Sequence, residues 1–308
     1  MNAVFYFGQY FVWVFLKALE SSKIAYLFPM NYYLKHCAAF GKPIKPIYIN
    51  QIWVGLFMSG ATKPKLSAEK VMKLIDHTIL FAYTEEKQVD ALVKDAARLG
   101  TYSVCVLPEY AAHAKELIDE NKYDLKLAVV ADFPFGAKTT AQRRDEIRAL
   151  RGVADEIDIV VQIGLVKSGK FGDVARDIAE IVNEAHAGGM KLKVIIETAY
   201  LTTQEKERVS EIVIGSGADF IKTSTGFADK DYTASIGNES VGATVADVAL
   251  MASVAERLGK KEVGIKASGK VRTAQQVFDL LTASKRPADP DYFRVGASAT
   301  EAIYKELQ

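Results

Sequence analysis

The sequence predicts an α/β protein whose main part is a (β/α)8 barrel of the TIM-barrel type, with an extra N-terminal extension. From residue 65 onward, short β-branched runs alternate with amphipathic stretches of helical spacing. Eight such strand-then-helix units fit within about 250 residues, the usual size of this barrel. No glycine-rich dinucleotide fingerprint follows any expected strand, which disfavours a doubly wound open sheet.

The expected strands are short runs rich in Val, Ile and Phe, bounded by polar or glycine-containing segments. In order, they cover residues 71–77, 102–107, 126–133, 156–162, 191–198, 220–225, 263–268 and 292–297. The expected helices carry apolar residues at helical spacing, as in Val245, Val248 and Ala252. In order, they cover residues 85–99, 109–121, 140–151, 174–187, 204–216, 245–258, 274–284 and 300–307.

Residues that favour helix ends flank several of these helices. Thr84 and Thr244 stand at the start of two of them, as expected N-caps. Gly100, Gly188 and Gly259 close three others, because glycine readily takes the backbone conformation that ends a helix. The strand and helix assignments therefore have local support at their boundaries.

The composition is that of a globular intracellular protein. The chain has 308 residues, of which 49% are hydrophobic and 25% charged, and its formal net charge is +1. This balance excludes a disordered chain, and it disfavours a nucleic-acid binder, which would carry an excess of Lys and Arg. Cys37 and Cys105 form neither a disulfide framework nor a zinc spacing, and the four histidines lack metal-binding companions. We therefore expect a cytoplasmic protein without a metal or cofactor.

Residues 1–62 differ in character from residues 63–308, the expected barrel domain. They hold about half of the aromatic residues and both tryptophans. Their first apolar run, residues 3–16, is shorter than the roughly 20 residues that span a bilayer. An accessory extension is the favoured interpretation. Membrane or organelle targeting and a misassigned gene start are the alternatives.

Charged residues occupy inward-facing positions on four of the expected strands. Alternate side chains of a barrel strand face the lumen, and the others pack under the helices. Apolar neighbours such as Ile221 and Ile265 belong under the helices. The lumen then receives Lys222, Lys266, Asp158 and Glu197.

Two lysines on consecutive strands favour carbonyl chemistry. Lys222 and Lys266 would enter a low-dielectric lumen near its C-terminal rim, where barrel active sites lie. Neighbouring ammonium groups disfavour each other's protonation, which lowers the pKa of at least one of them. The resulting free amine can form a Schiff base, while Asp158 accepts and returns protons. Each charge alone is equally explained by a structural ion pair, but the three together predict an imine-forming enzyme.

Six segments resemble deoxyribose-phosphate aldolases, in order, from about residue 71 to residue 305. They are LIDHT at 74–78, SVCV at 103–106, DEID at 155–158, VIIET at 194–198, FIKTSTG at 220–226 and GIKASG at 264–269. The resemblance implies a metal-free class I aldolase that reversibly cleaves 2-deoxy-D-ribose 5-phosphate into D-glyceraldehyde 3-phosphate and acetaldehyde. Residues 1–62 have no counterpart in it.

The resemblance also implies roles for individual residues. Lys222 matches the Schiff-base lysine, Lys266 the second lysine that tunes it, and Asp158 the carboxylate that works with it through water. Asp76 and Cys105 resemble pocket-lining residues, although Cys105 is equally well explained as plain core. Thr225 and Gly226 stand where the family contacts substrate.

The phosphate end of the site departs from the family pattern. Gly269 ends the seventh strand, Gly296 and Ser298 end the eighth, and barrels commonly bind phosphate with the loops after these strands. The family usually has glycine where Lys270 stands and serine where Ala299 stands. Lys270 is therefore either a counter-charge for phosphate or a solvated surface residue.

Two alternatives to this aldolase remain. One is an aldolase-like barrel that acts as a binding protein, and the other is a different phosphosugar enzyme of the same fold. An isomerase is disfavoured, because it would use a glutamate base rather than paired lysines. The expected partner is a small phosphosugar and not a nucleic acid. Homo-oligomerisation and membrane contact of residues 1–62 stay open.

Overall fold

The structure, a computed structural model, describes residues 66–238 and 240–308. The expectations about the N-terminal extension concern residues outside this part of the chain. Contacts along the chain place the boundary of the barrel unit between Lys63 and Pro64.

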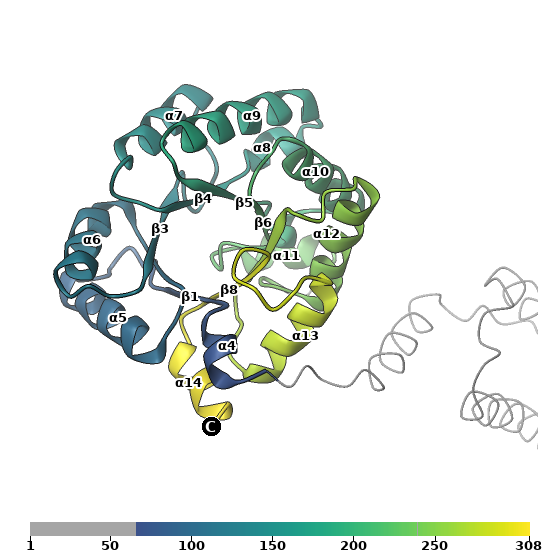
Figure 1. The fold of residues 1–308 in the computed structure, drawn as a ribbon. Helices are drawn as coiled ribbons and strands as arrows, with labels where there is room; N and C mark the ends of the chain where they lie inside the picture. Colours follow the sequence, from purple (N-terminus) through teal and green to yellow (C-terminus); the bar gives the residue numbers. More distant parts are fainter. Residues whose placement is uncertain (1–65, 239) are drawn as a thin grey trace, which may run out of the picture. The chain divides into compact units, whose positions relative to one another are not determined.

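Eight parallel strands close into a barrel in sequence order, and the helices surround this ring (Figure 1). The strands are β1 (Ile75–Thr78), β2 (Ser103–Val106), β3 (Lys126–Ala131), β4 (Glu156–Val160), β5 (Lys191–Ile195), β6 (Phe220–Lys222), β7 (Gly264–Ser268) and β8 (Phe293–Ala297). The barrel predicted from the sequence is confirmed.

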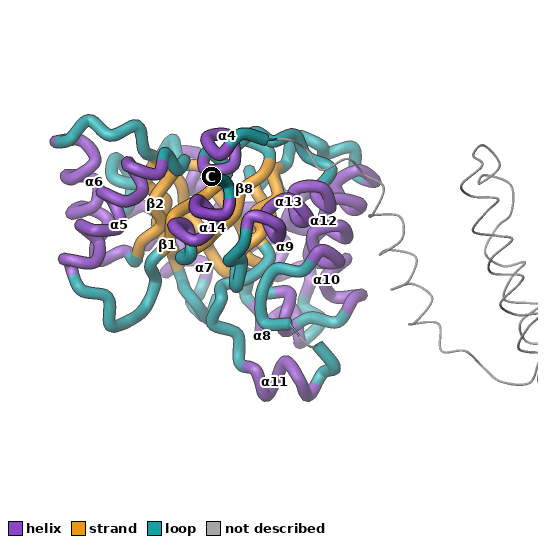
Figure 2. Tube along the Cα trace, turned by 90° about the horizontal axis from the view of Figure 1, so that it is seen from below, coloured by secondary structure: helices purple, strands orange, loops and turns teal. Residues whose placement is uncertain are grey.

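The helices cover the outside of the barrel and its two ends. They are α4 (Ala68–Met72), α5 (Glu86–Leu99), α6 (Ala111–Glu120), α7 (Thr140–Ala149), α8 (Ile163–Lys167), α9 (Phe171–Ala187), α10 (Thr203–Gly215), α11 (Lys230–Ser235), α12 (Val245–Arg257), α13 (Ala274–Ser284) and α14 (Thr300–Glu306), with short 3-10 turns η2 (Pro108–Tyr110) and η3 (Thr198–Tyr200). Figure 2 shows α4 at one end of the barrel and α8 and α11 at the other.

Local capping explains where many helices begin. Thr139, Thr202 and Thr273 each accept a hydrogen bond from the backbone three residues on and form a capping box. The expected cap Thr244 is confirmed by its bond to the backbone N–H of Asp247. The expected cap Thr84 is wrong, because the neighbouring Glu85 forms the capping box instead.

The first strand is shorter than predicted, because a helix occupies its beginning. The Ser67 side chain accepts a hydrogen bond from the N–H of Lys70 and starts α4, which contains Val71 and Met72. Strands β5 and β6 each end three residues early, at Ile195 and Lys222, and just after β5 Glu197 has a positive φ of 49° that breaks the extended backbone. Helices α8 and α11 were not predicted, because five or six residues are too few to show a periodic pattern.

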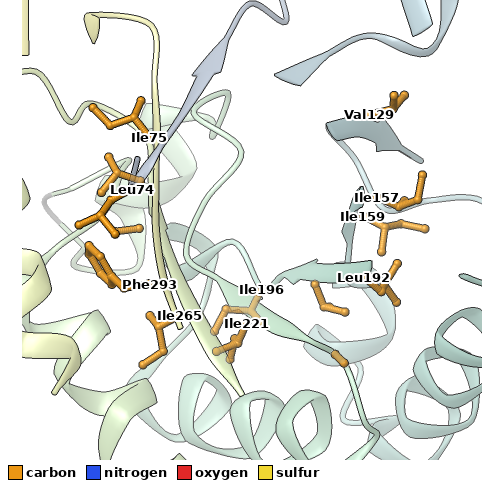
Figure 3. Packing of buried hydrophobic residues seen from close by; sticks show 14 of the residues in the cluster. Leu74, Ile75, Val129, Ile157, Ile159, Leu192, Ile196, Ile221, Ile265 and Phe293 are labelled. Atoms are coloured by element: carbon orange, nitrogen blue, oxygen red, sulfur yellow. The ribbon is translucent and has the colours of Figure 1, made fainter. Parts of the chain in front are cut away.

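The main core lies between the outer face of the barrel and the helices. Figure 3 shows Ile157, Ile159, Ile221 and Ile265 in this buried cluster. Each flanks a charged residue in its strand, so the charged neighbours must face the lumen. The inward positions predicted for Asp158, Lys222 and Lys266 are confirmed, whereas Glu197 lies beyond the end of β5 and bonds to Thr225.

Candidate active site

The lumen of the barrel contains a network of buried charges. Three carboxylates and four cationic groups from six strands have almost no exposure to solvent. They are Asp76, Glu156, Asp158, Lys193, Lys222, Lys266 and Arg294. A group of ionised side chains this deeply buried is stable only when each has a partner, and every member of this set does.

Asp158 is the centre of this network. Its Oδ2 accepts from the ammonium groups of Lys222 at 2.7 Å and Lys266 at 2.6 Å. Its Oδ1 accepts from Lys193 at 2.8 Å. The two lysines predicted from the sequence therefore share one carboxylate oxygen, and the contact is direct rather than through water. Their strands are paired so that Lys222 lies beside Lys266.

Deeper groups hold this centre in place. The Lys193 ammonium also contacts Glu156 at 2.6 Å, and the Arg294 guanidinium joins Glu156 at 2.9 Å to Asp76 at 2.5 Å. The Ser103 hydroxyl donates to the same oxygen of Asp76 at 2.7 Å. This part of the network fixes the carboxylates that the two upper lysines contact.

The two upper lysines differ in their carboxylate contacts. Lys266 contacts Asp158 and, at 2.5 Å, Asp76, whereas Lys222 contacts Asp158 alone. Burial lowers the pKa of Lys222, and the positive charge of Lys266 lowers it further. The negative charge of Asp158 raises the pKa of Lys222, but not enough to bring it back to the ordinary value. Burial also lowers the pKa of Lys266, but its two carboxylates outweigh this and raise it above the ordinary value. Lys222 is therefore the group that most readily becomes a neutral amine.

The charge balance of the network agrees with this assignment. Four cationic groups face three carboxylates when all are ionised. Loss of one proton makes the network neutral, and Lys222 is the only one of its lysines whose pKa is lowered. Burial raises the pKa of Asp158, but its three lysine neighbours hold it well below the usual range. Asp158 is thus ionised in this arrangement, and it accepts hydrogen bonds rather than carrying a proton.

One side of the lumen is apolar. Cys105 is fully buried in a small cluster with Leu80, Ala128 and Val130, against which Phe133 packs. Burial raises the pKa of the Cys105 thiol to about 11, so the thiol is neutral near pH 7. Cys105 therefore belongs to an apolar wall of the lumen.

A buried glutamate fixes the loop that follows the reactive lysine. Glu197 Oε2 accepts from the backbone N–H of Thr225 at 3.0 Å and also from its hydroxyl. The Thr225 oxygen in turn accepts from the N–H of Phe227 at 3.0 Å. Thr225 is thus held at the rim of the lumen with Gly226 beside it.

Glycines allow two rim loops to approach each other closely. Gly226 and Gly269 both have positive φ, at 89° and 90°, and a Cβ on Gly269 would lie 3.6 Å from the Gly226 Cα. A Cβ on Gly242 would lie 2.4 Å from the Gly269 carbonyl oxygen, which only glycine tolerates. The structure therefore brings together the predicted substrate loops after β6 and β7.

The remaining predicted phosphate residues lie at the same end of the barrel, in and around the loops after β7 and β8. Lys270 is exposed, has a φ of 59°, and makes no hydrogen bond or ion pair within residues 66–238 and 240–308. Gly296 lies against Ser268 and Lys266, where a Cβ would be 3.0 Å from the Ser268 Cβ. Ser298 is exposed just before α14.

Sequence reasoning missed Lys193, Glu156 and Arg294 as members of the site. The signal was present, because each alternates with outward-facing apolar residues in the way that Asp158 does. Their importance depends on partners from other strands, which alternation alone does not identify. In the described part of the chain no group of three or more metal-binding side chains is suited to hold a metal ion, and no helix is long and apolar enough to cross a membrane.

Comparison with known proteins confirms the resemblance seen in the sequence. Residues 70–305 match the family described as DeoC/LacD family aldolase. The deoxyribose-phosphate aldolase of Thermoplasma volcanium is 42% identical over 244 residues, which are 79% of this chain and 97% of that protein. That of Pyrobaculum neutrophilum is 39% identical over 233 residues, or 76% of this chain and 98% of that protein.

A solved structure extends this likeness to the fold. The tetrameric deoxyribose phosphate aldolase from Aeropyrum pernix is 27% identical, with a TM-score of 0.64 that covers 78% of this chain and 91% of that chain. The chain belongs to the DeoC/LacD family of aldolases.

Proposed function

We propose that this protein is a deoxyribose-phosphate aldolase of class I, in which Lys222 forms the Schiff base. The single observation that carries this proposal is the shared oxygen of Asp158, which holds one lysine with a lowered pKa beside one with a raised pKa. The relatives named above support the substrate, since both are deoxyribose-phosphate aldolases.

The first half of the reaction forms the imine. The neutral amine of Lys222 attacks the C1 aldehyde of open-chain 2-deoxyribose 5-phosphate, and a carbinolamine forms. Proton transfer to its hydroxyl group expels water and leaves a protonated imine. The Lys266 ammonium donates to the same Asp158 oxygen as the Lys222 nitrogen. Lys266 and Asp158 therefore give and take the protons that imine formation requires.

The second half breaks the carbon–carbon bond. A base removes the proton from the C3 hydroxyl, the electrons of the C2–C3 bond move toward the cationic imine, and glyceraldehyde 3-phosphate leaves. The enamine that remains takes a proton at C2, and water then releases acetaldehyde and the free Lys222 amine. Asp158 is ionised and its Oδ2 lies next to the Lys222 nitrogen, so Asp158 is the base that accepts this proton.

The phosphate is expected at the loops after β7 and β8. Gly269 and Gly296 stand where these two strands end, and Ser298 and Lys270 are exposed at the same end. Asp76 acts in this scheme by holding Lys266 protonated, and Thr225 with Gly226 borders the sugar. Homo-oligomerisation, as in the tetrameric relative, and a cytoplasmic location belong to the same proposal.

Borohydride trapping tests the proposal directly. Treatment of the full chain with acetaldehyde and borohydride should reduce the imine and leave an ethyl group on Lys222, located by peptide mass spectrometry. Lys222→Met should abolish the adduct, while Lys126→Met, a change at an exposed lysine of β3, should not. An adduct on Lys266 with Lys222 unmodified would contradict the assignment.

Turnover of 2-deoxyribose 5-phosphate with and without EDTA tests the substrate and the expected independence from metal. Release of acetaldehyde at the same rate in both conditions is the expected result. A rate that falls with EDTA and returns with added zinc would replace the imine mechanism with a metal-assisted one.

A further inference from the structure

Three aromatic rings from three different loops meet at the C-terminal end of the barrel. Phe81 follows β1, Phe133 follows β3, and Phe227 follows β6. The ring centroid of Phe227 lies 6.0 Å from that of Phe81 and 5.5 Å from that of Phe133. The interplanar angles are 70° and 88°, so both contacts are edge-to-face. Phe227 is the ring that joins the other two.

The topology places this contact over the opening of the barrel. Strand β2 separates β1 from β3, strands β4 and β5 separate β3 from β6, and strands β7 and β8 separate β6 from β1. The C-terminal ends of parallel strands all lie on one face of the barrel. Rings that start from three separated points of a closed circle can meet only by reaching across it. The three phenylalanines therefore form an aromatic bridge over the mouth of the lumen.

The bridge is continuous with the reactive site below it. Phe133 packs on the apolar wall that contains the fully buried Cys105. The Lys222 side chain lies deep beneath this layer, and only 2% of its surface is exposed. The bridge and the buried amine therefore belong to the same end of the barrel.

The backbone of Phe227 is fixed, but its ring is not enclosed. The Glu197–Thr225 pair holds the N–H of Phe227, and both of these residues are buried. The ring itself is 42% exposed and touches other rings only by edge contacts, which are individually weak. The Phe227 side chain can therefore rotate without any change at the buried Glu197–Thr225 pair.

We propose that Phe227 is a specificity-determining residue whose ring closes the aromatic bridge over the imine and limits the size of the acceptor aldehyde. The proposal rests on the aldolase function given above, because the enamine on Lys222 must be the donor. With the bridge closed, a compact aldehyde fits between the ring and Lys222, whereas a bulky one meets the ring of Phe227. The ring also keeps bulk water away from the enamine until the acceptor arrives.

The test compares two acceptors in the synthetic direction, with acetaldehyde as donor in the full chain. The ratio of kcat/KM for benzaldehyde to that for glyceraldehyde 3-phosphate should rise roughly tenfold or more in Phe227→Ala, a change on the scale at which pocket size separates substrates. Phe227→Trp should lower the same ratio.

Tyr83→Ala is the matched control. Tyr83 stacks on Phe81 with ring centroids 5.2 Å apart, and it is 75% exposed. Among the described residues its ring makes no contact with the ring of Phe227. This variant should leave the ratio as in the parent protein. An unchanged ratio in Phe227→Ala, or an equal rise in Tyr83→Ala, would overturn the role of Phe227.

Imine trapping in the same variants separates this proposal from the aldolase assignment. Phe227→Ala should still give the acetaldehyde–borohydride adduct on Lys222, because the lysine network lies below the bridge. If Phe227→Ala gives the adduct but leaves the kcat/KM ratio unchanged, the role of Phe227 in acceptor choice is refuted and the aldolase function is not. Absence of the adduct in the parent protein would refute the aldolase function and, with it, this proposal.

Discussion

At the residue scale, Lys222 and Lys266 show how the same side chain acquires two different roles. Both are buried, both contact the same oxygen of Asp158, and their strands are adjacent. The second carboxylate, Asp76, contacts only Lys266 of the two. One additional negative charge in a low-dielectric lumen raises the pKa of Lys266 above its ordinary value, whereas the pKa of Lys222 is lowered.

Lys266→Leu should therefore change both the rate and its pH dependence. We expect turnover to fall by at least about 100-fold, the scale of general acid–base catalysis. The pKa of Lys222 should rise, because a neighbouring positive charge has been removed while Asp158 remains. A higher pKa leaves more Lys222 protonated at a given pH, so the acidic limb of the pH–rate profile should move to higher pH.

The stability of this variant provides a necessary comparison, since removal of one member of a buried ion pair typically costs about 3–5 kcal/mol. Rates should be measured at a temperature where circular dichroism shows a folded protein. Lys126→Leu, at an exposed lysine, is the control and should leave the profile in place. A profile unchanged in Lys266→Leu would contradict the electrostatic role.

At the element scale, the loop between β7 and α13 combines a glycine with an unusual lysine. Lys270 has a φ of 59°, a left-handed conformation that disfavours residues with a Cβ by roughly 1–2 kcal/mol. This backbone explains why a glycine suits the position. A lysine at this position is consistent with a function of its positive charge. Lys270 is exposed, and its ammonium can reach a phosphate bound at the neighbouring loops.

Two substitutions at this position separate charge from backbone. If Lys270 binds phosphate, Lys270→Met and Lys270→Gly should both raise the KM for 2-deoxyribose 5-phosphate, and the unphosphorylated sugar should be almost unaffected. The loss should shrink at high salt, because an exposed charge pair is screened. A KM that falls in Lys270→Gly would instead show that the lysine only hinders close approach of the backbone.

At the scale of the whole molecule, the buried network links the stability of the barrel to pH. Burial raises the pKa of Asp76, but its cationic neighbours, led by Lys266, hold it well below the ordinary carboxyl value, as they do for Asp158. In the unfolded chain these carboxyls take up protons near pH 4, whereas the folded protein keeps them ionised. The unfolded state then binds more protons, so stability falls as the pH drops below about 4.

Denaturant titrations between pH 2.5 and pH 7 should show this loss as a falling free energy of unfolding. Burial raises the pKa of Asp132 and of Asp177, so these two act in the opposite direction and delay the loss to low pH. Asp158→Asn should reduce the slope below pH 4, and Asp145→Asn, at an exposed residue, should not. Equal slopes in all three proteins would exclude a contribution from the network.

The barrel unit should also function without the N-terminal extension. The family match begins at residue 70, and the 244 residues shared with the Thermoplasma volcanium protein are 97% of that relative. A protein that starts at Lys63 should therefore fold and retain turnover comparable to that of the full chain, as judged by circular dichroism and acetaldehyde release. Insolubility or loss of turnover would assign residues 1–62 a structural part in the site.

The sequence alone was sufficient for the fold class and for the inward position of Lys222, Lys266 and Asp158. Side-chain alternation in a strand is local, so Ile221 and Ile265 reveal that Lys222 and Lys266 face the lumen. The motifs identified the family for the same reason, since they are short segments with a fixed order. Element boundaries depend on more than alternation: the apolar pair Val71 and Met72 fits a strand, but the cap at Ser67 makes it helical.

Only the tertiary structure decided which of these groups act together. Lys222 and Asp158 are 64 residues apart, and Lys266 and Asp158 are 108 apart, so their common oxygen depends on closure of the barrel and on strand register. The same holds for the contacts of Arg294 and for the aromatic bridge through Phe227. A pKa and a ring contact depend on distances between strands that are remote in sequence, and alternation within one strand carries no information about those distances.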